Sequence, residues 1–147
     1  MIPSAFYVFG HYTQPVSLWY DTVTMDKKIL IIEDEPDIRE AMAEAVAEAG
    51  FEVLTAENGQ VGFEKAVTEQ PDLVLLDIVM PVMDGLTTMK KLREDPRGKN
   101  LKIIMLTSMD DVNNIASAHD YAITDYIIKP HSSLEEIVKK VKDVVLM

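Results

Sequence analysis

The sequence predicts a single α/β domain built on a parallel β-sheet with helices on both faces. Short apolar runs alternate five times with amphipathic segments between about residue 28 and the end of the chain. Runs that are apolar at every position are typical of strands buried on both faces, and helical segments provide the crossovers that parallel strands need. Polar residues follow several of these runs directly, at the sheet edge where folds of this class bind ligands.

The composition narrows the class of protein. Of 147 residues, 48% are apolar and 27% charged, which suits one globular domain with a full core. The net charge of −11 argues against nucleic acid as a direct partner. The chain has no cysteine, no apolar run near the ~18 residues of a membrane span and no basic segment at its start. We therefore expect a cytoplasmic protein without membrane insertion.

Residues 1–25 differ from the rest of the chain. Positions 1–24 hold six of the ten aromatic residues but only one charged residue, Asp21, and no helical or alternating period persists. We predict an N-terminal tail that is disordered or precedes a true start at Met25, followed by the domain at residues 26–147. The alternative is a docking arm, because exposed aromatic clusters tend to find a partner.

The first strand and helix are the clearest pair. Ile29–Ile32 is a continuous apolar run that ends in three acids, residues 33–35. Pro36 suits the first turn of a helix, and apolar residues at helical spacing continue until Gly50 stops it. The outer face of this helix is either merely solvated or a docking surface for a basic partner, and it carries Glu40, Glu44 and Glu48.

The remaining elements follow in the same alternation. We expect strands at 51–56, 73–77, 102–106 and 126–128, and helices at about 61–67, 86–92, 111–121 and 134–145. The turn signal Asn58-Gly59 precedes the second helix, and a capping box of Ser133 and Glu136 starts the last one. The helix at 111–121 is the weakest of the set.

Four strands deliver polar residues to one edge of the predicted sheet. Glu33 and Asp34 follow the first strand, Asp77 the third, Thr107 the fourth and Lys129 the fifth. Clustered carboxylates raise each other's pKa, and their oxygen atoms favour a hard cation such as Mg²⁺. A lysine and a hydroxyl can bind phosphoryl oxygens, and a carboxylate nucleophile would form an acyl phosphate. Each residue except Asp77 has a plain structural explanation when taken alone, so the joint pattern carries the prediction.

This constellation resembles the receiver domain of two-component response regulators, of the single-domain, chemotaxis-regulator-like kind. The resemblance covers residues 26–147 and rests on Glu33-Asp34, Asp77, Met80-Pro81, Met83-Asp84-Gly85, Thr107, Tyr126 and Lys129-Pro130. It implies a flavodoxin-like doubly wound sheet of five parallel strands in the order 2-1-3-4-5. Ser108, Ala122 and His131 depart from the residues that are most common in the family.

The resemblance also implies a role for each site residue. Asp77 would accept a phosphoryl group from a sensor histidine kinase or a histidine phosphotransfer protein, with Lys129 and Thr107 assisting. Asp34, Asp77 and the backbone carbonyl of Val79 would bind Mg²⁺ directly, and Glu33 through water. Thr107 and Tyr126 would form the switch pair. The protein would catalyse only its own phosphorylation and dephosphorylation, and with no output domain after the last helix it would act on an unidentified output protein.

Three other functions compete with this interpretation. A flavin or nucleotide binder would need a Gly- or Ser/Thr-rich loop after the first strand, where this chain has the acids 33–35. A phosphatase resembling the haloacid dehalogenases would have a second aspartate at position 79, which is Val79 here. The third alternative is a degenerate receiver that binds partners without phosphorylation. The resemblance to receiver domains also implies that the side chains two residues after Asp77 and two after Thr107 border the path of the attacking water. Here they are Val79 and Met109, which cannot orient water by hydrogen bonding, so we expect a long-lived phosphorylated state.

Overall fold

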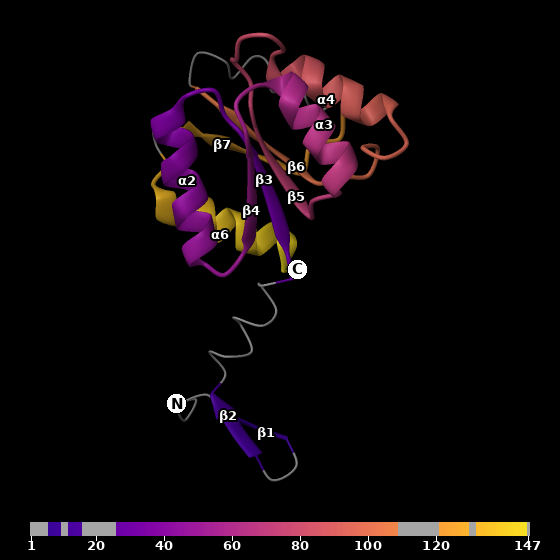
Figure 1. Ribbon diagram of the computed structural model, residues 1–147. Coiled ribbons are helices and arrows are strands. Elements are labelled where there is room, and N and C mark those ends of the chain that lie inside the picture. Colours follow the sequence, from indigo (N-terminus) through magenta and orange to yellow (C-terminus); the bar gives the residue numbers. More distant parts are fainter. Residues whose placement is uncertain (1–5, 10–11, 16–25, 109–120, 130–131, 147) are drawn as a thin grey trace.

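The computed structural model describes residues 6–9, 12–15, 26–108, 121–129 and 132–146. Its central feature is a sheet of five parallel strands (Figure 1). In spatial order these are β4 (Glu52–Ala56), β3 (Lys28–Ile32), β5 (Leu73–Asp77), β6 (Ile103–Thr107) and β7 (Asp125–Ile128). When only the five strands of this sheet are numbered along the chain, from β3 as the first, their spatial order is 2-1-3-4-5. The predicted fold class is therefore confirmed.

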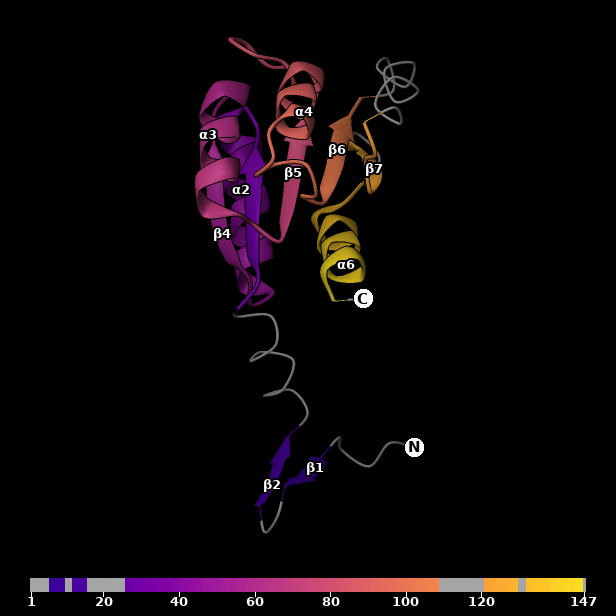
Figure 2. The ribbon, with the colours of Figure 1, turned by 90° about the vertical axis from the view of Figure 1, so that its right-hand side faces the viewer.

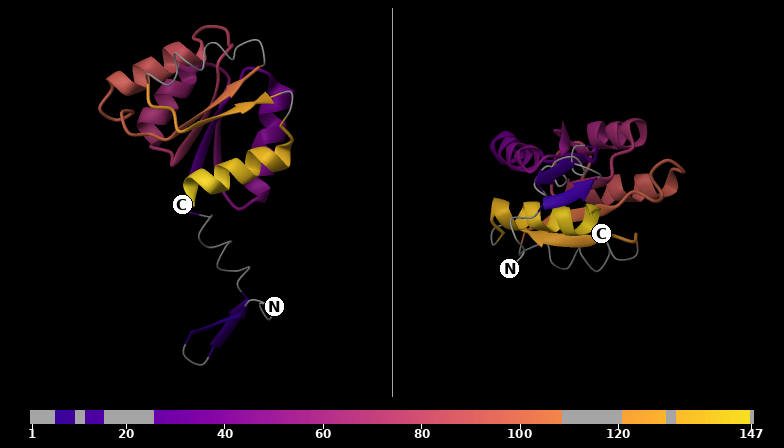
Figure 3. Two further views of the ribbon diagram at one scale, coloured as in Figure 1. Left: turned by 180° about the vertical axis from the view of Figure 1, so that it is seen from behind. Right: turned by 90° about the horizontal axis from the view of Figure 1, so that it is seen from below.

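Four described helices cover the two faces of this sheet. They are α2 (Pro36–Glu48), α3 (Gly59–Glu69), α4 (Gly85–Glu94) and α6 (Leu134–Val145). One apolar cluster joins α2 and α6 to alternate strand residues such as Ile29 and Ile31, and a second joins α3 and α4 to Leu30 and Ile32. In Figure 1, α3 and α4 lie to the upper right of the strands and α2 and α6 to the lower left. Figure 2 shows β4, β5, β6 and β7 side by side from left to right, and Figure 3 shows the ribbon from behind and from below.

Short local interactions set where the helices start and stop. The Asn58 side chain accepts a hydrogen bond from the Val61 N–H at 2.9 Å and caps α3. Ser133 Oγ accepts from the Glu136 N–H at 3.2 Å, so the serine half of the predicted capping box is present at α6. Gly50, at φ 101°, has the left-handed backbone expected of a glycine after a helix.

Two parts of the chain, residues 111–121 and the N-terminal tail, lie largely outside the described residues. Of the helix expected at residues 111–121, only Tyr121 lies within the described residues, where it forms a turn. In the N-terminal tail, where we expected no regular element, β1 (Phe6–Phe9) pairs antiparallel with β2 (Tyr12–Pro15). Three of the four residues of β1 are aromatic, a type that favours strands, whereas β2 has one aromatic residue, Tyr12. The assignment of residues 1–25 as a tail stays a prediction.

Candidate functional site

Three carboxylates meet at the carboxyl edge of the sheet. Glu33 and Asp34 follow β3, and Asp77 ends β5, the strand that pairs directly with β3. Each of the three offers an oxygen atom, and these atoms lie within 4.8 Å of one another. Glu33 is fully buried and Asp77 is 6% exposed, whereas Asp34 is half-buried. The structure therefore brings together the acids that the sequence placed on separate strands.

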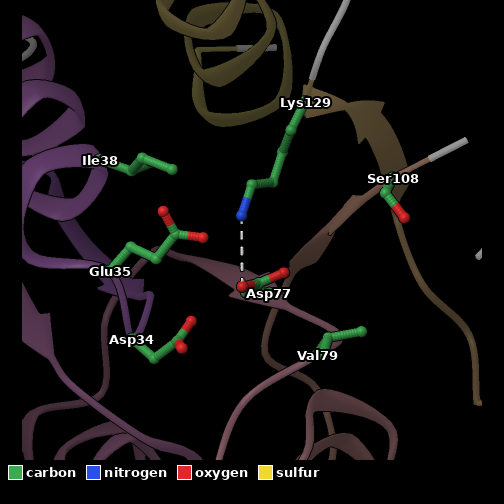
Figure 4. Close-up of a pocket in the computed structure, with 7 residues that line it drawn as sticks. All are labelled: Asp34, Glu35, Ile38, Asp77, Val79, Ser108 and Lys129. Carbon is green, nitrogen blue, oxygen red and sulfur yellow. Dashed lines mark hydrogen bonds and ion pairs between the residues drawn. The ribbon is translucent and has the colours of Figure 1, made fainter.

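Lys129 reaches this cluster from the end of β7, two strands away from β5. Its Nζ lies 2.9 Å from Glu33 Oε2 and 3.3 Å from Asp77 Oδ2. Figure 4 shows the side chain extended from its strand toward the Asp77 carboxylate. One ammonium group thus bridges two buried carboxylates, an arrangement that holds all three side chains in place and offsets part of their charge.

Burial and the neighbouring charges shift the pKa values of Asp77 and Lys129. Burial, followed by the charge of Glu33, raises the pKa of Asp77 from 3.8 to about 7, although Lys129 acts in the opposite direction. Burial disfavours the charged form of Lys129, but its bond to Glu33 and the charge of Asp77 together raise its pKa. The predicted mutual effect of the acids is confirmed at Asp77, with burial as the larger cause. The cluster therefore carries more negative charge than Lys129 offsets.

The loop after β5 is fastened to the strand end that carries Asp77. The Gly85 N–H donates to the Ile78 carbonyl oxygen at 2.8 Å, and a Cβ at position 85 would collide with the Asp77 carbonyl oxygen. Asp84 caps α4 by accepting from the Thr87 N–H at 2.7 Å. Only a glycine lets the start of α4 pack this closely against the strand end. The Asp84-Gly85 pair therefore has a structural reason in this fold.

A pocket of about 530 Å³ opens at the cluster. It is lined by Asp34, Glu35, Ile38, Asp77, Val79, Ser108 and Lys129 (Figure 4). The charged groups come from three different strand ends, and Val79, which is 62% exposed, stands at the rim. The volume far exceeds that of a water molecule, so a phosphoryl group and a hydrated ion both fit beside Asp77.

Thr107 and Tyr126 lie on β6 and β7, the last two strands of the sheet. Thr107 is 1% exposed, and its Oγ donates to the Ser108 carbonyl oxygen at 3.1 Å. Tyr126 pairs with Met105, two residues before Thr107, so both side chains leave the same face of the sheet. The tyrosine side chain is directed outward, since the residue is 39% exposed. The coupling expected between this pair stays a prediction.

Sequence reasoning missed one residue at the site, Arg39. Its Nη1 donates to the carbonyl oxygens of Glu33 at 2.8 Å and Asp34 at 3.2 Å. Helical side chains lean toward the N-terminus of their helix, so an arginine in the first turns of α2 can reach back to the preceding loop. The place of Arg39 in the first turns of the predicted helix was therefore the sequence feature that could have indicated this contact. Met109, Pro130 and His131 lie outside the described residues.

The donor set suits a hard divalent cation. Carboxylate oxygens of Glu33, Asp34 and Asp77 lie within 4.8 Å of one another, and two of these residues, Asp34 and Asp77, line the pocket. Oxygen ligands of this kind are those that Mg²⁺ and Ca²⁺ take in proteins. After burial, the charge of Glu33 is the next cause of the raised pKa of Asp77, and a bound cation would offset that charge. The cluster can therefore hold a metal ion. Among the described residues, none of the helices combines the length and apolar character needed to cross a membrane.

The sequence of residues 29–142 matches the response regulator receiver domain family. The phosphate regulon transcriptional regulatory protein PhoB of Pseudomonas aeruginosa is 39% identical over 118 residues, which are 80% of this chain and 51% of PhoB. The transcriptional regulator RpaA of Synechocystis is 35% identical over 115 residues, which are 78% of this chain and 47% of RpaA. The chain thus spans about half the length of these curated relatives.

Among solved structures, the fold is similar to that of the chemotaxis protein CheY4 of Vibrio cholerae. The TM-score is 0.74 at 29% sequence identity, and the match covers 80% of this chain and 98% of CheY4. The region that matches both kinds of relative is the five-stranded domain that carries the acidic cluster.

Proposed function

Because this chain belongs to the response regulator receiver domain family, we propose that it is a phosphoacceptor signalling protein in which Asp77 takes up the phosphoryl group. Receiver domains are signalling modules of two-component systems rather than metabolic enzymes, and their partners are sensor kinases or phosphotransfer proteins. Family membership also disfavours the flavin binder and the haloacid-dehalogenase-like phosphatase. One observation carries the proposal: a buried carboxylate at a strand end lies beside two further acids and a lysine.

The chemistry assigned to Asp77 is a nucleophilic displacement at phosphorus. One of its carboxylate oxygens forms a bond to the phosphorus of a phosphohistidine on the donor protein. The P–N bond breaks as this O–P bond forms, and the electron pair leaves with the imidazole nitrogen. The product is an acyl phosphate on Asp77. The reaction requires the carboxylate to be ionised, so any group that lowers the raised pKa of Asp77 would increase the reactive fraction.

Positively charged and hydrogen-bonding groups surround the position of the new phosphoryl group. Lys129 Nζ already lies 3.3 Å from Asp77 Oδ2 and can shift to a phosphoryl oxygen with a small change of side-chain conformation. The Thr107 hydroxyl, on the neighbouring strand, can leave the Ser108 carbonyl and donate to a second oxygen. Both groups would thus change partners when the phosphoryl group arrives.

Asp34, Asp77 and the backbone carbonyl of Val79 would hold Mg²⁺ directly, with Glu33 acting through water. Bound there, the ion neutralises charge on the transferring phosphoryl oxygens and on the carboxylates. The convergence of the three acids within 4.8 Å supports this ligand set. The half-buried Asp34 lines the pocket, so its carboxylate is accessible to an ion from solvent.

The proposed output is a change in partner binding. Movement of Thr107 toward the phosphoryl group would leave space at the same face of the sheet for Tyr126 to turn inward from its exposed position. Phosphorylation would then shift the population between two arrangements of these side chains. A Thr107→Ala variant should accept the phosphoryl group without changing partner affinity.

The test of the acceptor is direct. We expect acetyl phosphate or phosphoramidate with Mg²⁺ to add one phosphoryl group to the intact protein, as seen by mass spectrometry, and Asp77→Asn to add none. Asp84→Asn is the matched control, because it changes an acid in the same loop while asparagine still caps α4. A phosphoryl group that persists in Asp77→Asn would overturn the assignment.

The metal has its own test. Millimolar Mg²⁺ should raise the melting temperature of the wild-type protein relative to EDTA, because the ion binds only the folded state. Asp34→Ala should lose this increase and should phosphorylate poorly. Identical melting curves with EDTA and with Mg²⁺ would show that the acidic pocket does not bind the ion.

A further inference from the structure

Arg39 contacts the acidic residues of the site through their backbone and not through their carboxylates. One guanidinium nitrogen, Nη1, donates to two consecutive carbonyl oxygens, those of Glu33 at 2.8 Å and Asp34 at 3.2 Å. Its own N–H donates to the Glu35 carbonyl at 2.9 Å. Among the described residues, no salt bridge pairs Arg39 with an acid. The arginine thus engages all three residues of the loop without occupying a carboxylate.

These bonds hold a part of the chain that the sheet no longer supports. The bond from the Glu33 N–H to the Ala56 carbonyl, at 3.1 Å, follows the last residue pair of β3 and β4. The N-cap Glu35 makes no side-chain cap bond to α2, and its N–H lies at a long 3.4 Å from Glu33 Oε1. Among the described residues, the hydrogen-bond partner of the Glu33 and Asp34 carbonyls is the Arg39 guanidinium.

The direction of a side chain is set by the peptide planes on either side of it. A rotation of the plane between Glu33 and Asp34 would move its carbonyl away from Arg39 and would swing the Asp34 carboxylate away from the Asp77 carboxylate. With both carbonyls bonded, the acids keep the arrangement in which their oxygens lie within 4.8 Å of one another. A rigid supporting group is what a metal site needs in addition to its ligands.

We propose that Arg39 is a positioning residue of the cation site, which acts by fixing the backbone that carries Glu33 and Asp34. The inference rests on the proposed Mg²⁺ site. It makes a prediction that simple electrostatics does not. Removing a positive charge near three carboxylates should strengthen cation binding by Coulomb's law, whereas loosening the ligand loop should weaken it. The sign of the change therefore separates the two roles.

Arg93 provides a matched control elsewhere in the molecule. Its guanidinium also donates to backbone carbonyls, those of Tyr121 at 2.8 Å, Gly98 at 2.9 Å and Ala122 at 3.1 Å. It lies in the last turn of α4, at the other end of the helix from Gly85. Arg93→Met removes the same kind of hydrogen bond without touching the loop that carries the acids.

The experiment is a titration of MgCl₂ into the ¹⁵N-labelled full chain, followed by amide NMR spectra. The same spectra show whether each variant is folded. We expect Arg39→Met to bind Mg²⁺ about tenfold or more weakly than wild type, the range typical of lost supporting partners at metal sites. Arg39→Lys keeps the positive charge but only part of the hydrogen bonding, so its affinity for Mg²⁺ should lie between those of wild type and Arg39→Met. Arg93→Met should keep the wild-type affinity even if it melts at a lower temperature.

The outcomes separate this inference from the proposed function. If the amides around Asp34 and Asp77 in the wild-type protein do not respond to Mg²⁺, the metal site itself is wrong. If wild type binds and a folded Arg39→Met binds equally or more tightly, Arg39 has no positioning role. Should Arg39→Met fail to fold, Arg39→Lys decides in its place, and wild-type affinity in that variant would overturn the proposal.

Discussion

The ends of β3 and β5 bring carboxylates to the same edge of the sheet, and the loops that follow these two strands are held in different ways. The loop between β3 and α2, residues 33–35, is short and is bonded through its carbonyls to Arg39, with Glu33 fully buried. The loop between β5 and α4, residues 78–84, is longer and is held at its two ends. Ile78 and Met80 are buried and the Ile78 N–H donates to the Leu106 carbonyl oxygen at 3.2 Å, while Gly85 packs on Asp77 where α4 begins. The tip of this loop projects outward, with Val82 82% exposed.

The difference shows that a strand-end carboxylate needs support only from the backbone next to it. Asp77 is the last residue of a buried strand and takes its position from the sheet, so most of its loop is free of that task. Glu33 and Asp34 lie beyond the last strand residue and need a bond from outside the sheet. The free tip of the second loop even contains a valine with φ 70°, a backbone region that costs a β-branched residue on the order of 1–3 kcal/mol.

The largest effect is expected where the second loop is fastened. Gly85→Ala should lower the free energy of unfolding by about 3 kcal/mol or more, because the new Cβ meets the Asp77 backbone, which cannot move without shifting the strand. Urea unfolding monitored by circular dichroism measures it.

Gly62→Ala is the control for Gly85→Ala. The three atoms nearest to its Cβ would all belong to the buried Ile32 side chain and not to the backbone. This side chain would have to shift, so Gly62→Ala should lose some stability, but less than Gly85→Ala. If the two variants lose equal stability, the backbone contact at Gly85 is not what fastens the loop.

The pH dependence of stability tests the contact between the two loops. The pKa of Asp77 is raised to about 7, so between about pH 4 and pH 7 the folded state holds a proton that the unfolded state has lost. Without metal, stability should therefore fall as pH rises through this window, by on the order of 4 kcal/mol for the full shift. Urea unfolding in EDTA at several pH values measures this slope.

Two variants isolate the contribution of Asp77. In Asp77→Asn this part of the slope should disappear, and in Glu33→Gln it should shrink, because the charge of Glu33 is one cause of the raised pKa. Mg²⁺ should also flatten the slope by favouring the ionised carboxylate. A wild-type slope that persists in Asp77→Asn would refute this account.

The lifetime of the acyl phosphate tests the role of Val79 at the rim of the pocket. Val79 lines the pocket, and neither it nor Met109 can orient an attacking water by hydrogen bonding. Val79→Asn combined with Met109→Glu should speed hydrolysis about tenfold, a barrier change of ~1.4 kcal/mol. First-order decay of the phosphoprotein with Mg²⁺ present gives the rate. An unchanged or slower decay in the double variant would remove the argument.

The smallest effect is expected at the tip of the second loop. Val82→Gly should raise the free energy of unfolding by about 1 kcal/mol, because relief of the strained backbone exceeds the entropy that glycine adds to the unfolded chain. Val79→Gly is the matched control. Val79 is an exposed valine of the same loop, and it is not among the described residues that have a positive φ. It should lose stability instead. Equal changes in both variants would show that Val82 is not strained.

Much of the fold and of the site followed from local pattern. The runs at Ile29–Ile32 and Leu73–Leu76 are apolar on every residue because both faces of these strands are covered, and that leaves a readable trace in the sequence. Parallel strands end at one edge, so the residue after each run could be placed there without coordinates. The convergence of Glu33, Asp34 and Asp77 was predictable for this reason.

The sequence by itself determined the parallel sheet, its helices and the edge at which the acids collect, because hydrophobic periodicity and chain direction are local properties. Only the tertiary structure decided how those acids are held. Lys129 bridges Glu33 and Asp77 from 96 and 52 residues away, and the collision that requires Gly85 is with the end of a neighbouring strand. Such contacts depend on the distances between separate elements. A change of a few tenths of an ångström in such a distance is enough to break a hydrogen bond or to create a clash with a Cβ atom. No spacing in one stretch of chain encodes a distance of that accuracy.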